Sequence, residues 1–213
     1  KHVFVEKPLA ITWEGLDAIV KTYVELGDKA PMLMVGFNRR FSPALVKLRK
    51  VLAQRRSPLM MNYRLNGGYI PLDHWVQGLQ GGGRNIGEAC HMYDVFRSLA
   101  GAPVESITAH AIDPKSSEYL RSDNFIASMT YKDGSVATLT YTALGPKKGM
   151  SKEFLEVFCD GEAYIVDDYK TLRRASDDTV LWSGATDKGH ATQIELLGLA
   201  MKKGEFAPIC FED

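Results

Sequence analysis

Residues 84–99 are the stretch that most constrains how this chain can fold. They follow three consecutive glycines, and their apolar side chains recur at helical spacing in two stripes. The stripes consist of Ile86, Ala89, Cys90 and Tyr93, and of Met92, Val95, Phe96 and Leu99. A helix that is apolar around most of its circumference has to be buried, so we expect the rest of the chain to pack around it.

Two acids and a histidine lie close together in this predicted helix. Glu88 and His91 are three positions apart, which makes them neighbours on a helix, and Asp94 lies three positions further on. An acid beside an imidazole inside a core is costly unless a partner or a function accounts for it. The pattern fits a general acid-base histidine, and it fits equally a structural histidine satisfied by the acid. A metal site that adds His74 is less favoured, because no compact ligand motif is present.

The first 37 residues follow a strand–helix–strand pattern. Apolar runs at 2–6 and 32–37 flank a helical segment for which Thr12 is a suitable N-cap. Such a unit predicts two parallel strands joined by a right-handed crossover.

Charged residues follow both of these predicted strands. Glu6 and Lys7 are at the end of the first, and Arg39 comes shortly after the second. Ligands of open α/β sheets lie beyond the carboxyl ends of the strands, so Lys7 is placed to face a nucleotide and to serve in acid-base chemistry. From spacing alone, a surface ion pair of Glu6 with Lys7 is the more common arrangement. Arg39 can hold a phosphate or carboxylate, or form an interdomain ion pair.

After the central helix, β-strand patterns dominate. A strand is expected at 59–65, and further strands at 104–112, 125–131, 136–142, 153–158, 163–166 and 179–182. Lys132-Asp133-Gly134 and Asp160-Gly161 are suited to hairpin turns. A helix that starts at Ser42-Pro43 and a closing helix within 187–203 complete the pattern. The fold class is therefore α+β: a large, mainly antiparallel sheet of six or seven strands with helices on one face, preceded by a βαβ tail.

Composition excludes some classes of function. The 26 basic and 26 acidic residues give no net charge, which argues against a nucleic-acid or anionic-membrane partner. No apolar run reaches the length of a membrane span. The three cysteines are an odd number without C-x-x-C spacing, so we expect reduced thiols in a cytoplasmic protein and no zinc site.

Several short motifs together resemble the Gfo/Idh/MocA oxidoreductases, the family of glucose-fructose oxidoreductase and inositol dehydrogenase. They are HVFVEKPLA at 2–10, VGFNRRFSP at 35–43, Gly81-Gly82-Gly83 followed by His91 and Asp94, and DKGH at 187–190. By this resemblance, residues 1–36 are the C-terminal tail of a truncated Rossmann dinucleotide-binding domain, and residues 37–213 form the α+β substrate and oligomerisation domain. Most of the Rossmann fold and a final helix are then expected outside this chain.

The resemblance also implies roles for individual residues. Lys7 would contact nicotinamide and substrate and assist proton transfer, and His91 would be the acid-base or substrate ligand. The common pattern has an aspartate four residues before this histidine, where the present chain has Gly87, so Glu88 is the candidate for that catalytic role. The expected cofactor contacts are Glu6, Lys7 and Arg39. The expected substrate contacts are Arg64, Asn66, His74, Trp75 and Asp94, four of which lie in or beside a long loop from 66 to 83.

The implied activity is hydride transfer between NAD or NADP and a hydroxyl of a sugar, nucleotide sugar or cyclitol. We expect the full-length parent to be the dehydrogenase, a homo-oligomer assembled through its sheet, and this chain alone to be inactive. One alternative is a non-catalytic ligand-binding or oligomerisation module of the same fold, which the missing acid at Gly87 favours. A second alternative is a glycosidase that uses NAD for a transient oxidation.

Overall fold

A computed structural model describes residues 1–211, and its chain begins with a small parallel sheet. Strands β1 (Val3–Val5) and β2 (Leu33–Val35) pair in parallel. Helix α1 (Trp13–Leu26) connects them and is capped by Thr12, whose side chain accepts a hydrogen bond from the Gly15 amide at 3.1 Å. The βαβ unit predicted from the sequence is confirmed.

The second sheet has eight strands in the order β10-β9-β8-β7-β3-β6-β5-β4. All neighbouring strands are antiparallel except β3 and β6, which pair in parallel. The strands are β3 (Met60–Asn66), β4 (Val104–Ala111), β5 (Phe125–Tyr131), β6 (Val136–Thr142), β7 (Glu153–Cys159), β8 (Glu162–Asp167), β9 (Thr171–Arg174) and β10 (Val180–Ser183). The predicted mainly antiparallel sheet is confirmed, and β9 is the strand that the prediction omitted. This strand is short and ends in two arginines, so it carries little apolar signal.

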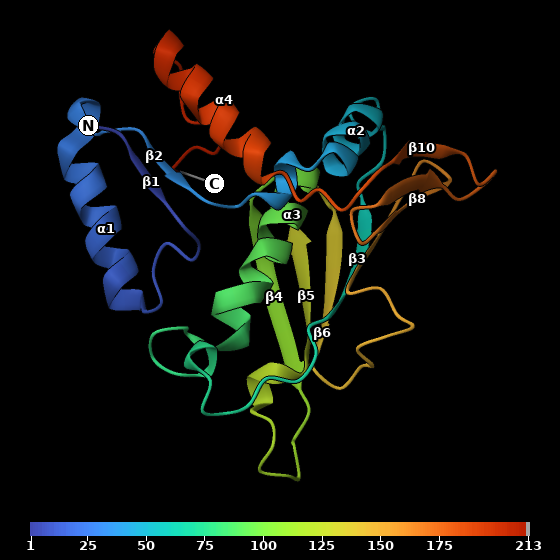
Figure 1. Cartoon of the computed structure of the whole chain (residues 1–213). Coiled ribbons are helices and arrows are strands. Elements are labelled where there is room, and N and C mark those ends of the chain that lie inside the picture. The colour runs from blue at the N-terminus through green and yellow to red at the C-terminus, as the bar shows by residue number, and fades with distance from the viewer. Residues whose placement is uncertain (212–213) are drawn as a thin grey trace.

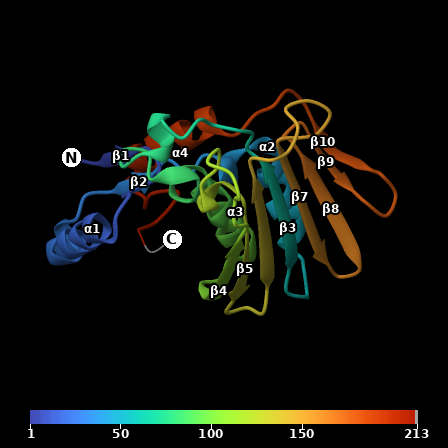
Figure 2. The same ribbon diagram turned by 90° about the horizontal axis from the view of Figure 1, so that it is seen from below.

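Helices cover only one face of the large sheet. Helix α2 (Pro43–Leu52) and helix α3 (Cys90–Ala100) lie against the face that also looks towards β1, β2 and α4 (His190–Lys203), as Figure 2 shows. Ser42 caps α2 by accepting a hydrogen bond from the Leu45 amide at 3.2 Å, as its place before Pro43 predicts. The other face of the sheet carries no helix in the part of the chain that the structure describes (Figure 2).

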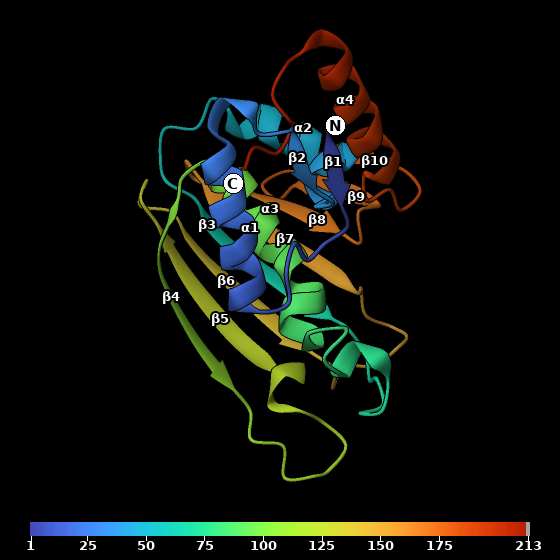
Figure 3. The same cartoon turned by 90° about the vertical axis from the view of Figure 1, so that its left-hand side faces the viewer.

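The main core lies between this face and the two helices. Alternate residues of the central strands point inward, and they meet the apolar sides of α2 and α3. The largest buried side chains of this core include Leu45, Leu48, Met61, Leu65, Met92, Phe96, Tyr131 and Tyr141. A second, smaller cluster of Met34, Phe41, Leu197 and Ile209 joins β2 to α4. Figures 1 and 3 show the small sheet, α1 and α4 together on the side of α3 away from the large sheet.

The central helix is buried as predicted, but it is not regular. Residues Asn85–Ala89 form a π-helical turn, and the α-helical part starts at Cys90. Ile86 on the π turn is 37% exposed, so the predicted first stripe does not form one buried face. A π turn adds a residue to one helical turn and so rotates the side chains before it relative to those after it.

Two sequence-based expectations about the whole molecule can be compared with the structure. Cys90, Cys159 and Cys210 are all free thiols, as expected. Among residues 1–211, no helix combines the length and the apolar character that crossing a bilayer requires.

Candidate active site

One contact joins the small parallel sheet to the central helix. The Nζ of Lys7, just after β1, donates a hydrogen bond of 2.5 Å to the main-chain carbonyl oxygen of Gly87 in the π turn. No ion pair between Glu6 and Lys7 forms, although both lie within the described residues, so the surface pair that spacing favoured is absent. Lys7 therefore reaches the helix that carries His91.

His91 is buried at the start of α3. Only 6% of the residue is exposed, its Nδ1 has no hydrogen-bond partner, and its ring packs edge-on against Phe37 with centroids 6.1 Å apart. Burial lowers the pKa of the imidazole to about 2, and the positive charges of Arg39 and Lys7 contribute in the same direction. His91 is therefore neutral near pH 7, with a buried polar atom that remains unsatisfied.

A buried carboxylate beside His91 binds several donors at once. Glu153 is 1% exposed and accepts two hydrogen bonds from Arg39, from Nε at 2.8 Å and from a terminal nitrogen at 3.0 Å. Tyr63 donates to the same carboxylate at 2.6 Å, and Lys188 forms a short ion pair with it. Burial alone would raise the pKa of Glu153, but Arg39 and Lys188 lower it to about 2. This cluster fixes the segment after β2 and the segment before α4 to the large sheet.

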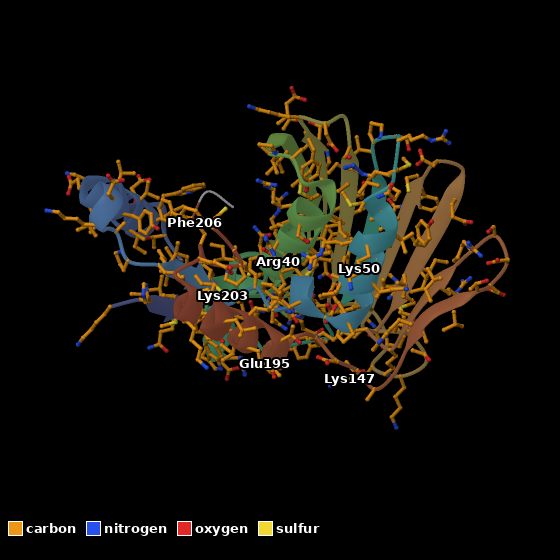
Figure 4. The ribbon with its side chains drawn as sticks, turned by 90° about the horizontal axis from the view of Figure 1, so that it is seen from above. Arg40, Lys50, Lys147, Glu195, Lys203 and Phe206 are labelled. Carbon is orange, nitrogen blue, oxygen red and sulfur yellow. The ribbon has the colours of Figure 1, made fainter. Side chains whose placement is uncertain are left out.

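The guanidinium group of Arg39 is thus paired with a carboxylate of the protein itself. It was expected to contact the cofactor, yet its side chain is 7% exposed and paired with Glu153. Arg39 and Glu153 both lie within residues 37–213, so this ion pair is internal to the expected substrate domain and is not an interdomain pair. Asp94 has a similar environment: its carboxylate pairs with Arg40, whose Nε lies 3.1 Å from Oδ2, and both are buried. Figure 4 places Arg40 at the centre of the molecule, among the helices.

The Glu88 carboxylate is not bonded to His91. No hydrogen bond or ion pair joins the two residues, both of which the structure describes. The Glu88 carboxylate instead binds the Tyr141 hydroxyl in a short hydrogen bond and Lys152 at 2.8 Å. Burial alone would raise the pKa of Glu88, but the charges of Lys152 and Arg84 and the hydrogen bonds from Lys152 and Tyr141 together lower it. The predicted contact with the imidazole was based on regular helix geometry, and Glu88 lies within the π turn.

The glycines around this turn have a steric role. A Cβ on Gly87 would lie 2.7 Å from the carbonyl oxygen of Gly81, so no side chain fits there without movement of the backbone. Gly82 and Gly83 have φ values of 69° and 76°, which allow the loop to bring Gly81 over the helix. The aspartate of the family pattern therefore has no room at position 87.

The remaining expected substrate contacts are spread over the molecule. Arg64 lies on the open face of the sheet, over the ring of Phe154 and bonded to the Ser151 carbonyl at 2.9 Å, which is the opposite side from α3. Asn66 is buried at the end of β3 and donates to the Pro146 carbonyl at 2.8 Å. His74 accepts a hydrogen bond from the Val76 amide at 3.3 Å, and Trp75 is 63% exposed on the 66–83 loop.

Sequence reasoning missed four residues of the site: Gly87 as an acceptor, Tyr141, Glu153 and Lys188. A signal for Glu153 was present, because strand alternation places it on the same inward face as Leu155 and Val157. An inward glutamate needs buried donors, and an arginine such as Arg39 can supply them. Among residues 1–211, no three His, Cys, Asp or Glu side chains are grouped so that they could hold a metal ion.

Comparison with known proteins finds a family match for part of this chain. A model of the oxidoreductase family, C-terminal alpha/beta domain, of the Gfo/Idh/MocA group matches residues 56–155. Residues 56–155 belong to the Gfo/Idh/MocA oxidoreductases. The matched stretch contains the π turn, His91 and most of the large sheet, including Glu153.

Curated relatives carry names of cyclitol dehydrogenases. Inositol 2-dehydrogenase 2 of Saccharopolyspora erythraea is 32% identical over 126 residues, which cover 58% of this chain and 34% of the relative. The scyllo-inositol 2-dehydrogenase (NAD(+)) of Bacillus subtilis is 25% identical over 151 residues, 68% of this chain and 43% of the relative. The chain thus spans well under half the length of these Gfo/Idh/MocA relatives.

Solved structures share the fold along the whole chain. A levoglucosan dehydrogenase in complex with NADH and levoglucosan superimposes with a TM-score of 0.78 at 20% identity, covering 99% of this chain and 67% of that one. An oxidoreductase domain protein from Kribbella flavida gives 0.77 at 19% identity, covering 100% and 68%. The fold shared with these structures therefore includes the small parallel sheet and α1 as well as the matched domain.

Proposed function

We propose that this chain is part of an NAD(P)-dependent oxidoreductase that transfers hydride between a nicotinamide cofactor and a hydroxyl of a sugar, nucleotide sugar or cyclitol. In this proposal residues 1–36 are the end of a dinucleotide-binding domain, and residues 37–213 are the substrate domain. The relatives named inositol dehydrogenase and the levoglucosan dehydrogenase support this substrate class.

One observation carries the proposal. The hydrogen bond from Lys7 to the Gly87 carbonyl brings the lysine of the first sheet to the helix that holds His91. The two groups come from segments more than 80 residues apart, and Lys7 is close enough for its charge to lower the pKa of His91. A lysine and a neutral imidazole at one site suit proton transfer from an alcohol.

The residues present fit a nicotinamide cofactor. Lys7 and Phe37 follow the carboxyl ends of the parallel strands β1 and β2, the edge at which such sheets bind ligands. The unpartnered Nδ1 of His91 provides a buried polar atom for a ligand group. Bound there, NAD or NADP would supply the ring that exchanges hydride with the substrate carbon.

The protein's own groups then account for the proton. As the substrate carbon gives up hydride to the nicotinamide ring, the hydroxyl proton would pass to the unpartnered nitrogen of His91, and negative charge would develop on the substrate oxygen during this transfer. The neutral His91 can hydrogen-bond this hydroxyl, and Lys7, Arg39 and Lys188 surround the imidazole with positive charge. The positive charges that add to the effect of burial on the His91 pKa would also favour the developing alkoxide.

A second function is supported by a different observation. Glu88 binds Tyr141 and Lys152, so His91 has no carboxylate partner from its own helix turn. A module that keeps the fold for ligand binding or oligomerisation, without chemistry, would tolerate this arrangement. The transient NAD-dependent oxidation of a glycosidase is a variant of the first function and would use the same groups.

The test uses the full-length protein that contains this chain. It is incubated with NAD or NADP and a panel of inositols, anhydrosugars and nucleotide sugars, and reduced nicotinamide is followed by fluorescence. We expect reduction with at least one hydroxyl-bearing substrate, lost in the Lys7→Met variant and kept in Lys21→Met, which alters an exposed lysine of α1. Cofactor binding without reduction by any substrate would instead support the non-catalytic module.

Assembly through the sheet remains part of this proposal. The face of the large sheet without helices exposes apolar side chains, among them Met60 at 56% and Ile126 at 48%. We expect the full-length protein to elute as an oligomer in size-exclusion chromatography with light scattering, and Ile126→Lys to weaken the assembly. A monomeric wild-type protein would contradict this part of the proposal.

A further inference from the structure

A buried polar cluster beneath the π turn has no part in the chemistry described above. Arg84 is completely buried, its Nε donates to the Tyr141 hydroxyl at 2.5 Å, and its guanidinium lies over the Tyr141 ring at 5.3 Å. Tyr141 in turn donates to Glu88, and a terminal nitrogen of Arg84 is 3.5 Å from the same carboxylate. Lys152 completes the cluster from the loop before β7.

This cluster ties the π turn to the large sheet. Arg84 immediately precedes the turn, Glu88 is the last polar residue of the turn, and Tyr141 belongs to β6 in the core. Gly67 allows the approach, because a Cβ there would lie 2.1 Å from a terminal nitrogen of Arg84. Between the two anchored residues lies Gly87, whose carbonyl accepts the Lys7 hydrogen bond.

We propose that Glu88, Tyr141 and Arg84 are positioning residues that fix the π turn so that the Gly87 carbonyl holds the Lys7 ammonium group. The side-chain carboxylate expected one helical turn before His91 is thus replaced by a main-chain acceptor, and Glu88 serves by anchoring that acceptor. The proposal deepens the proposed function, because it concerns the lysine of the same site.

The steric environment of Gly87 supports this assignment. The carbonyl of Gly81 occupies the space of a side chain at position 87, so no acid can be accommodated there and the carbonyl of Gly87 is the available acceptor. A main-chain acceptor moves only when the backbone moves, so its position depends on the anchors on either side. An ammonium group held by a well-placed acceptor has fewer orientations available before reaction.

The first test measures the position of Lys7 without requiring turnover. Full-length wild-type protein, Tyr141→Phe and Glu88→Gln are treated briefly with an acetylating ester, and acetylation of Lys7 is quantified by peptide mass spectrometry. We expect Lys7 to react several-fold faster in both variants. Tyr131→Phe is the matched control, because Tyr131 is an equally buried tyrosine at the far end of β5 whose hydroxyl donates to the Met129 sulfur at 3.8 Å. Lys203 on α4 provides an exposed internal reference (Figure 4).

The second test measures turnover of the same proteins. Loss of a hydrogen bond to a charged group corresponds to about a tenfold effect or more, so kcat should fall by about tenfold in Tyr141→Phe and Glu88→Gln while KM for the cofactor stays within about twofold. Unchanged Lys7 acetylation in folded Glu88→Gln would overturn the inference, and this variant also decides the case if Tyr141→Phe does not fold. If the wild type has no activity, the proposed function fails while acetylation still tests the positioning role.

Discussion

The Nζ of Lys7 donates a hydrogen bond to the carbonyl oxygen of Gly87, 80 residues further along the chain, at 2.5 Å. This bond joins the small parallel sheet to the helix that carries His91. It also explains how a chain with glycine in place of the family aspartate can keep an acceptor for the lysine, since the main chain supplies one.

Removal of the Lys7 amine should abolish most of the turnover of the full-length protein. General acid-base groups contribute about 10²- to 10⁴-fold, so we expect kcat of Lys7→Met to fall by at least about 100-fold. The comparison is Lys21→Met on α1, where 77% of the side chain is exposed. A loss below about threefold in a folded Lys7→Met protein would remove Lys7 from the reaction.

Titration of His91 should make stability depend on pH. The folded imidazole has a pKa of about 2, whereas an unfolded histidine takes up a proton near pH 6.5. Below about pH 6.5 the unfolded state binds more protons, so the unfolding free energy should decrease as pH falls, by up to about 1.4 kcal/mol per pH unit. Urea unfolding between about pH 6.5 and 5 should show this slope in wild type and less of it in His91→Asn. Glu153, with a folded-state pKa of about 2, lowers the unfolding free energy further only below about pH 4.5, where the unfolded carboxylate takes up a proton.

The control for that experiment is His190→Asn, which alters an exposed histidine at the start of α4. It should keep the wild-type slope. If the unfolding free energies of wild type and His91→Asn fell equally with pH, this would contradict a buried, neutral His91.

Neutralising Glu153 should strongly destabilise the protein. Its buried carboxylate accepts hydrogen bonds from Arg39 and Tyr63 and an ion pair from Lys188, so Glu153→Gln leaves buried cations uncompensated. Breaking a buried ion pair costs about 3–5 kcal/mol, which urea unfolding can measure. Glu156→Gln, three residues further on the same strand and on its outward face, should stay within about 0.5 kcal/mol of wild type. Equal effects of the two variants would refute a special role for Glu153.

Two glycines of the last segment should respond in opposite directions to alanine. Gly189 has a φ of 83°, and a Cβ there would lie 2.5 Å from the backbone of Phe41 and Ser42, beside Arg39. Gly189→Ala should therefore lower the melting temperature. Gly198 lies inside α4 with open space around its Cβ position, so Gly198→Ala should stabilise by about 0.5–1 kcal/mol. Calorimetry measures the melting temperatures of both variants. A shift in the same direction for both would contradict the structure.

The fold was accessible from the sequence where local chemistry decides it. Thr12 and Ser42 cap helices because their side chains accept the first amide hydrogen bonds, and the turns at 132–134 and 160–161 follow from glycine. The parallel pairing of β3 with β6 was not accessible, because it depends on contacts between distant strands. The short β9 lacked an apolar pattern.

The site was accessible only in part, for a geometric reason. Lys7 and His91 were singled out by position and motif, and their roles remain predictions for experiment. Regular helix spacing suggested a bond between Glu88 and His91, whereas the carboxylate binds Tyr141 and Lys152 from within a π turn that tight glycine packing supports. Arg39 was assigned to a ligand because its partner, Glu153, lies 114 residues away in the chain.

The most direct test of the account is whether Lys7 and His91 act as one site. The full-length wild type, Lys7→Met, His91→Asn and the double variant are compared by kcat/KM with the best substrate of the panel. Residues that act as a unit are non-additive, so we predict that the double variant loses little more activity than the more damaged single variant. If the two losses instead multiply, Lys7 and His91 act independently and the central claim is wrong.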